Sequence, residues 1–303
     1  MTVRRWPDTL PTPSAPGFDL SPVDQAIRTN MEVGAQRVRR RTEADFDRVT
    51  MAWKFNPYEM DAFLIFRKSR PYSLIGASDD LSAWTFSGNN TTRQIEAVTG
   101  PGNLVVDSVL ETAATGLHRI EIAGPAINGA DVLFMATVKG IGRTLGRLSI
   151  LDRNGVQLYT EFDLSSGTLG GQSGLLSRSI TSRGDGWWRV AITADIGTGV
   201  STSQLSVRFR DDAGNLTYAG DITKGFGICE VAARIATGSD LFIPTDSAGK
   251  ALGADGGAAW FYAPMPDGSA LVSKEVRFVG PYKATAMAGL NWSVSAEVEV
   301  RNA

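Results

Sequence analysis

The sequence predicts an all-β protein with one short helix, made of two β modules, one of them inserted into the other. Short segments in which hydrophobic and polar residues alternate with a period of two recur along the chain, as half-buried strands do. The 303 residues include 33 glycines, and turn signals such as Asn154-Gly155 separate the segments. At about 100–200 residues per domain, this length fits two compact units.

The first segment, residues 1–68, starts with the proline-rich arm Trp6–Pro13, and prolines favour extended backbone. Extended backbone is also expected at Met31–Arg41. From Val49 to Phe55, large apolar side chains alternate with smaller or polar ones, which predicts a half-buried strand. Edge strands and extended arms leave backbone groups unpaired, so we expect neighbouring subunits to cover them.

One helix is predicted directly after this strand. Asn56 can cap a helix, Pro57 suits the first helical position, and Glu59 can complete a capping box with Asn56. Apolar residues then recur at helical spacing, so we expect a helix over 57–68.

Residues 69–243 form a long series of predicted strands. Eight strands in about 140 residues are typical of a jelly-roll β-sandwich. The eight segments are Leu104–Val109, His118–Ile122, Val132–Val138, Leu145–Leu151, Val156–Phe162, Trp187–Ala194, Gln204–Arg210 and Gly227–Val231.

The last segment, residues 244–303, returns to the style of the first. Its predicted strands are Ala258–Phe261, Val272–Val279 and Trp292–Val300. We therefore expect residues 1–68 plus 244–303 to form one discontinuous β domain. Residues 69–243 are then inserted at a loop after the helix, where insertions are well tolerated.

Charge and residue counts exclude several function classes. The net charge of -2 offers no global positive field for nucleic acid or an anionic membrane. A single cysteine, Cys229, and a single histidine, His118, allow no disulfide and no Cys- or His-rich metal site. Asp152–Gly155 and Asp211-Asp212 can contribute to a calcium site, but hairpin turns are expected at both. No catalytic motif is present, so we expect no catalytic residue, no metal, no cofactor and no enzymatic activity.

The first segment carries a basic cluster, Arg37, Arg39, Arg40 and Arg41. The cluster lacks the interleaved aromatic residues of nucleic-acid sites, and acidic residues follow at positions 43, 45 and 47. We expect it to form local ion pairs or an assembly interface with a neighbouring subunit, where arginine is favoured.

Aromatic residues of 69–243 are the candidates for ligand binding. Trp187 and Trp188 are adjacent in a predicted strand and therefore point to opposite sides of the sheet. Carbohydrate-binding β-sandwiches stack exposed rings on sugar faces, with nearby polar side chains bonded to the hydroxyls. Trp84, Tyr218 and one of the pair, taken as Trp187, are the candidate glycan-binding rings. Core packing is the alternative for each of them.

Ordered motifs occur at both ends of the chain: Trp6-Pro7-x-x-Leu10-Pro11-x-Pro13, Arg28-Thr29-x-Met31-Glu32-x-Gly34, Arg37-x-Arg39-Arg40-Arg41, Gly257-Ala258-Ala259-Trp260-Phe261, Val276-Arg277-Phe278-x-Gly280-Pro281-Tyr282 and Leu290-Asn291-Trp292-x-Val294. With these motifs the flanks resemble a phage tail-associated protein family. The resemblance implies the β-sandwich-plus-helix module of tail-tube and distal-tail proteins, which commonly assembles as a ring.

The insertion carries motifs of its own: Leu81-Ser82-x-Trp84, Gly184-Asp185-Gly186-Trp187-Trp188-Arg189-Val190, Gly220-Asp221, Gly225-x-Gly227-Ile228 and Phe242-Ile243-Pro244-Thr245. It resembles the carbohydrate-binding-like jelly rolls appended to phage fibres and tail proteins. The resemblance adds Asp221 to the glycan-binding candidates. The chain departs from that family at Trp187-Trp188, usually Trp-Tyr, and at Glu230-Val231-Ala232, usually Gln-Leu-Glu.

These resemblances imply a virion structural protein of a tailed bacteriophage, a distal-tail or baseplate component. The flanking domain is expected to form a ring, taken as a hexamer, with tail-tube and hub proteins as partners. The jelly roll is expected to project outward and bind host surface polysaccharide. We find no signal peptide or membrane-spanning run, so we expect synthesis in the host cytoplasm and a final place at the tail end of the virion. The alternatives are a capsid-decoration or fibre-anchoring protein, and a virion-associated polysaccharide-degrading enzyme.

Overall fold

A computed structural model describes residues 4–7, 9–14, 19–22, 26–29, 37–40, 45–76, 80–86, 89–101, 105–236, 241–267 and 270–302. The chain divides into two compact units, which we call unit 1 (Val3–Arg70 and Leu252–Ala303) and unit 2 (Pro71–Ala251). As predicted, the fold is mostly β, with one α-helix in the described ranges. No helix in these ranges is both long and apolar enough to cross a membrane.

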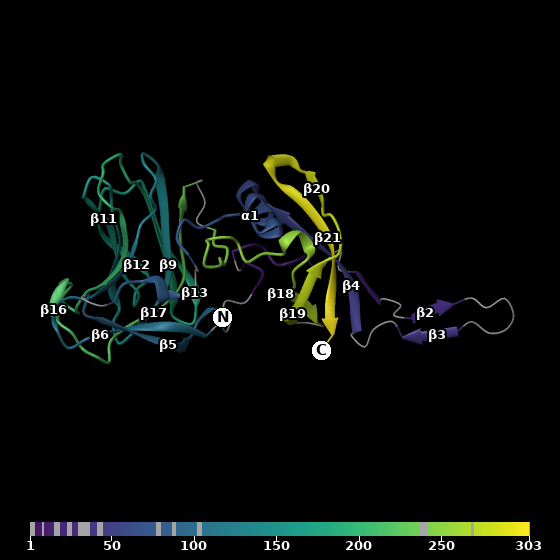
Figure 1. Cartoon of the computed structure of the whole chain (residues 1–303), viewed down its shortest axis with the longest axis horizontal. Coiled ribbons are helices and arrows are strands. Elements are labelled where there is room, and N and C mark those ends of the chain that lie inside the picture. Colours follow the sequence, from purple (N-terminus) through teal and green to yellow (C-terminus); the bar gives the residue numbers. More distant parts are fainter. Residues whose placement is uncertain are drawn as a thin grey trace. The chain divides into compact units, whose positions relative to one another are not determined.

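Unit 1 is built on an antiparallel six-stranded sheet that joins the two ends of the chain (Figure 1). β21 (Trp292–Asn302) pairs along its whole length with β4 (Asp45–Phe55). The other strands of this sheet are β1 (Asp19–Pro22), β18 (Phe261–Asp267), β19 (Ala270–Phe278) and β20 (Lys283–Ala286). β2 (Ala26–Thr29) and β3 (Arg37–Arg40) pair with each other.

α1 (Pro57–Lys68) has the bounds that the sequence predicts. The side chain of Asn56 accepts the Glu59 N–H at 2.9 Å, and the Glu59 carboxylate accepts the Asn56 N–H at 2.7 Å, which completes the capping box. Phe63 on α1 is fully buried and packs against Trp53 of β4 and Phe278 of β19. Among the described residues, short 3-10 helices span Leu81–Ala83, Asp255–Gly257 and Ala288–Leu290.

The described part of the proline-rich arm lies within unit 1. The Trp6 N–H donates to the Tyr262 carbonyl at 2.6 Å, and the Tyr262 N–H donates to the Arg4 carbonyl at 3.0 Å. The Trp6 ring is buried and stacks on Trp53, with ring centroids 5.2 Å apart. The expectation that neighbouring subunits cover this arm is therefore wrong at Trp6, because the aromatic core of its own unit already buries it.

Unit 2 is a sandwich of two antiparallel sheets. The five-stranded sheet has the order β12-β11-β10-β15-β8, and the six-stranded sheet has the order β13-β14-β9-β17-β6-β5. Leu148 of β10 and Phe134 of β9 are fully buried in one core between them. The strands are β5 (Thr91–Thr99), β6 (Val105–Glu111), β7 (Thr115–Leu117), β8 (Arg119–Ala123), β9 (Asp131–Ile141), β10 (Leu145–Leu151), β11 (Gln157–Asp163), β12 (Thr168–Ser173), β13 (Ser177–Gly184), β14 (Trp187–Asp195), β15 (Gln204–Phe209), β16 (Thr217–Ala219) and β17 (Gly225–Ile235).

The eight strands predicted between 104 and 231 are all present, with shifts of a few residues at their ends. The structure adds β5, β7, β12, β13 and β16 to them. Residues 244–251 lie in unit 2, since the Gly249 carbonyl accepts the N–H groups of Tyr72 and Ser73 at 2.9 Å each.

Candidate functional site

The five-stranded sheet of unit 2 carries polar side chains on its outer surface. In β10, Leu148 and Ile150 belong to the core, so Arg147 and Ser149 point to the opposite side of the sheet. The same alternation holds in β8, β11 and β15. We call the outward-pointing set the polar face: Arg119, Glu121, Arg147, Ser149, Gln157, Tyr159, Glu161, Gln204, Ser206 and Arg208.

The register of the strands places three arginines side by side on the polar face. Arg208 of β15 lies opposite Arg119 of β8 and opposite Arg147 of β10. Glu161 of β11 lies opposite Arg147 and completes this row. Like charges at directly opposed positions destabilise a sheet, so this row costs stability unless other groups offset it.

Two serines occupy the centre of the polar face. Ser149 and Ser206 lie opposite each other, and their hydroxyl oxygens are 2.7 Å apart. Both are buried although they point away from the core, with 0% and 3% of their surface exposed. Longer side chains around them, Arg208 among them, therefore lie flat over the sheet.

Arg208 crosses the polar face diagonally. Its Nε–H donates to Ser206 Oγ at 3.2 Å, and its Nη2 donates to Gln157 Oε1 on β11, beyond the intervening strand β10. Burial, together with the cations Arg119 and Arg147, lowers the pKa of Arg208 to about 10. The side chain is still protonated at neutral pH, as a partly desolvated cation.

Ion pairs fix the neighbours of Arg208. Arg147 Nη2 donates to Glu161 Oε1 at 2.6 Å, and Arg210 Nη1 lies 3.0 Å from Glu161 Oε2. The guanidinium carbon of Arg147 also lies 3.8 Å from the centroid of the Tyr159 ring, a cation–π contact. On the other side, Arg119 Nε lies 2.9 Å from Glu121 Oε2.

The polar face can bind a ligand rich in hydroxyl groups. Arginine offers several N–H donors, and glutamate and glutamine offer oxygen acceptors. Arg147 Nε and Gln157 Nε2 are buried and have no hydrogen-bond partner among the described residues. The charged side chains of Arg147 and Glu161 are only 14% and 16% exposed, so their positions are held by packing and ion pairing.

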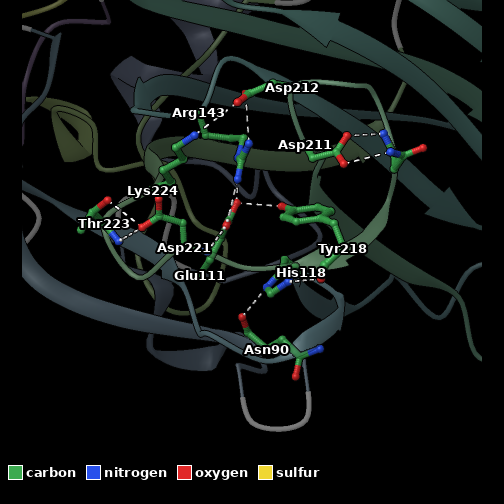
Figure 2. A network of polar contacts seen from close by, with 11 residues as sticks. Asn90, Glu111, His118, Arg143, Asp211, Asp212, Tyr218, Asp221, Thr223 and Lys224 are labelled. Carbon is green, nitrogen blue, oxygen red and sulfur yellow. Dashed lines mark hydrogen bonds and ion pairs between the residues drawn. The ribbon is translucent and has the colours of Figure 1, made fainter.

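A second polar cluster is buried inside unit 2 and is centred on Glu111 (Figure 2). Glu111 accepts hydrogen bonds from Arg143 Nε at 2.8 Å and Nη2 at 3.0 Å, from the Tyr218 hydroxyl at 2.7 Å, and from the Asp221 N–H at 2.8 Å. Burial lowers the pKa of Arg143, but the hydrogen bonds and charge of Glu111 outweigh it and raise that pKa overall. Burial and the bond to Glu111 raise the pKa of Tyr218 well above its usual value. Four donors satisfy the Glu111 carboxylate, so we assign this cluster a structural role.

His118 belongs to the same cluster and is fully buried (Figure 2). Its ring nitrogens Nδ1 and Nε2 lie 2.8 Å and 3.2 Å from the carbonyl oxygens of Asn90 and Tyr218. The imidazole ring also packs against the Tyr218 ring, with centroids 4.6 Å apart. His118 therefore packs β16 against the segment between β7 and β8.

The structure corrects the predicted glycan-binding rings. Trp84 is a buried member of the core of unit 2, and Tyr218 is bonded to Glu111. Trp187 is 1% exposed, and its Nε1–H donates to the Thr99 carbonyl at 3.1 Å. Its neighbour Trp188 lies under Gly167, where an added Cβ would come within 2.1 Å of the indole ring. Trp84, Trp187 and Tyr218 are therefore buried, whereas Trp188 is half-buried and packs against the core.

Asp221 is half-buried, and its side chain stabilises the turn in which it lies. Its carboxylate accepts the N–H of Thr223 at 2.9 Å and the Thr223 hydroxyl at 2.7 Å, and these bonds lower the pKa of Asp221. Of the arginines predicted for assembly, Arg37, Arg39 and Arg40 lie in β3, opposite Thr29, Ile27 and Ala26 of β2. Arg41 lies outside the described residues.

Sequence reasoning missed Arg147, Tyr159 and Arg208. The predicted strands 145–151, 156–162 and 204–210 already place these residues on the side away from the apolar positions. The missing information is the strand order, which brings β15 next to β10. No group of three histidine, cysteine or acidic residues in the described part of the chain can hold a metal ion.

No protein-family model matches this sequence, and no curated protein matches it. Among solved structures, the chain is similar to the CBM22-1 and GH10 modules of the Clostridium thermocellum endo-1,4-beta-D-xylanase 10B in complex with xylohexaose. The identity is 13% and the TM-score 0.34, over 55% of this chain and 29% of that one. It is also similar to the enzymatically active domain of bacteriophage CBA120 tailspike protein 4. Here the identity is 11% and the TM-score 0.29, over 54% of this chain and 20% of that one.

These neighbours correct one expectation. The poor inventory of catalytic residues predicts a protein that is not an enzyme, whereas one matched chain carries a GH10 module and the other is named as an enzymatically active domain. The prediction of a non-enzyme is therefore withdrawn. The chain spans less than a third of either matched chain, and TM-scores of this size assign it no reaction.

Proposed function

We propose that the polar face of unit 2 binds a sugar chain of a host surface polysaccharide. The observation that carries this proposal is a row of three arginines and one glutamate that lies beside an aromatic ring on the polar face. Sugar hydroxyls donate and accept, and Arg208 and Glu161 supply groups of both kinds. The half-buried Tyr159 ring, which Arg147 covers on one face, supplies the remaining apolar surface against which a sugar would pack. Because ion pairs and a cation–π contact already fix these side chains, ligand binding immobilises few additional rotamers.

The wider role follows from the resemblance of the flanks to tail proteins. We propose that the chain is a virion protein of a tailed bacteriophage, in a distal-tail or baseplate ring of six copies with tail-tube and hub proteins as partners. The flanks that carry the resemblance fold together in unit 1, which supports an assembly role for that unit. A ring presents many copies of unit 2, so weak binding at each copy adds up by avidity.

Binding is tested with the full chain and the envelope polysaccharide of the host. Tyr159→Ala is expected to weaken binding about tenfold, a loss of roughly 1.4 kcal/mol. Tyr58→Ala, which removes a tyrosine that is 53% exposed in unit 1, is the matched control and is expected to bind like the wild type. Equal binding by all three proteins, or none by any, would overturn the proposal. Reducing ends measured in the same incubation report any cleavage of the polysaccharide.

The virion role is tested separately by electron microscopy of virions labelled with an antibody against this chain. Label at the tail end supports the distal-tail or baseplate role. Label on the capsid would replace it with capsid decoration, and label only on fibres would replace it with fibre anchoring.

A further inference from the structure

The polar face carries an excess of positive charge. Together with the adjoining Arg210 and Asp163, it holds four arginines, Arg119, Arg147, Arg208 and Arg210, against three acidic residues, Glu121, Glu161 and Asp163. Four positive and three negative charges leave an excess of one positive charge. A surface made only to bind neutral hydroxyl groups has no need for this excess.

The two glutamates are already engaged by the outer arginines. Glu161 receives Arg147 on one oxygen and Arg210 on the other, at 2.6 Å and 3.0 Å. Glu121 receives Arg119 at 2.9 Å. Glu161 is thus paired at the β11 end of the row, whereas Glu121 lies opposite Ser206 and is held by its ion pair with Arg119.

Arg208, in the middle, forms no ion pair with a carboxylate among the described residues, although the charge of nearby Glu121 favours its protonated form. Its side chain donates hydrogen bonds to two neutral groups, the Ser206 hydroxyl and the side-chain oxygen of Gln157. A cation that is partly desolvated and flanked by two more cations gains more from an anion than an exposed arginine does. The lowered pKa of Arg208 has the same physical origin, since burial and its two arginine neighbours disfavour its charge.

We propose, resting on the glycan-binding function above, that the sugar chain bound on the polar face is anionic, with a singly charged acidic group placed against Arg208. The carboxylate of a hexuronic acid and a sulfate monoester share this chemistry. Either group accepts hydrogen bonds from the guanidinium and neutralises the middle of the row. The hydroxyl groups of the same sugar then lie within reach of Glu161, Gln157 and Gln204 on the surrounding positions.

The test measures binding of the full chain to three probes: oligogalacturonate, the same oligosaccharide with its carboxyl groups methyl-esterified, and a sulfated galactan oligosaccharide. Charged hydrogen bonds of this kind correspond to about a 10- to 100-fold preference for the acid over its ester. Arg208→Gln is expected to abolish that preference, because it weakens binding of the acid much more than binding of the ester. Arg70→Gln, which removes an equal charge at an exposed position of unit 1, is expected to keep it.

Arg208→Lys keeps the charge without the planar donor set, so it is expected to retain a reduced preference, and added salt is expected to shrink it. Preference for the sulfated probe over the carboxylate probe would assign the acidic group as a sulfate. Equal binding of acid and ester by the wild-type chain would overturn the inference while leaving glycan binding intact, as would a preference that Arg208→Gln retains. Absence of binding to every probe and to the host polysaccharide would overturn glycan binding itself.

Discussion

The guanidinium carbon of Arg147 lies 3.8 Å from the centroid of the Tyr159 ring, on the neighbouring strand of the five-stranded sheet. The same guanidinium is ion-paired with Glu161. Arg147 thereby links the charged row of the polar face to its one aromatic side chain. A ring held in this way loses little freedom when a ligand packs against it.

We predict that Arg147→Gln weakens binding of the host polysaccharide about five- to tenfold. The variant loses a cation–π contact of about 0.5–1 kcal/mol and releases both Tyr159 and Glu161 from their positions. Titration calorimetry of the full chain measures the change. Arg153→Gln, in the turn between β10 and β11, is the control and should bind like the wild type. If the polar face took no part in binding, Arg147→Gln and Arg153→Gln would have equal affinities for the polysaccharide.

Arg208→Gln should make the free protein more stable. The substitution removes a partly desolvated cation that lies opposite two other cations, and their repulsion and its burial outweigh the favourable charge of Glu121. A gain of about 1 kcal/mol corresponds to a rise in Tm of about 2–4 °C for a domain of this size. Calorimetric unfolding of the full chain without ligand tests this. A fall in Tm would mean that Arg208 stabilises the fold and is not kept for a ligand.

Glu111→Gln is predicted to destabilise unit 2 severely. The substitution leaves the buried guanidinium of Arg143 without its carboxylate, and breaking a buried pair in this way costs about 3–5 kcal/mol. Asp212→Asn also removes a partner of Arg143, but its side chain is 72% exposed, so we expect a loss below about 1 kcal/mol. Denaturant unfolding compares the two. Similar losses for both would contradict the structural role of the Glu111 cluster.

Trp187→Ala and Tyr159→Ala should have opposite effects. Trp187 is buried, so its truncation should cost about 3–5 kcal/mol of stability. If the truncated protein stays folded, it should keep its glycan affinity. Tyr159→Ala should instead lower affinity with little loss of stability. Measurements of Tm and of affinity on both variants separate the two effects. A loss of affinity without a loss of stability in Trp187→Ala would support Trp187 as a glycan-binding ring, as the sequence predicts.

Trp6→Ala should destabilise unit 1 in the isolated monomer. The ring stacks on Trp53 and packs edge-on against Phe66, so its removal leaves a cavity that costs about 3–5 kcal/mol. Thermal unfolding at low protein concentration measures this. An unchanged Tm in the monomer would show that the arm docks on a neighbouring subunit, as the sequence alone suggests.

Local signals in the sequence predicted local structure well. The Asn56–Glu59 capping box set the start of α1, and alternation of apolar residues located the strands that carry the core. Strand β12 is hidden in the sequence because Gly170 and Gly171 favour a turn, whereas here they lie at the irregularity in the β11–β12 pairing, next to Glu161. An edge strand that contains two adjacent glycines therefore cannot be recognised from its composition alone.

The site depended on information that a single sequence does not contain. Alternation places Arg147 and Arg208 on the outer surface of their strands, but only strand order and register bring them together. Burial of the tryptophans was equally hidden, because an aromatic residue in a strand has the same pattern whether its ring packs in a core or against a sugar. The Thr99 carbonyl that accepts the Trp187 N–H comes from a strand 88 residues away.

The most direct test of the account locates the bound sugar chain on the protein. The full chain is incubated with host polysaccharide fragments that carry a photoreactive group, and the cross-linked peptides are identified by mass spectrometry. Binding on the polar face predicts cross-links in the peptides that contain β10, β11 and β15. These cross-links should be lost when unlabelled fragments compete. Competed cross-links confined to unit 1, or to the six-stranded sheet of unit 2, would contradict it.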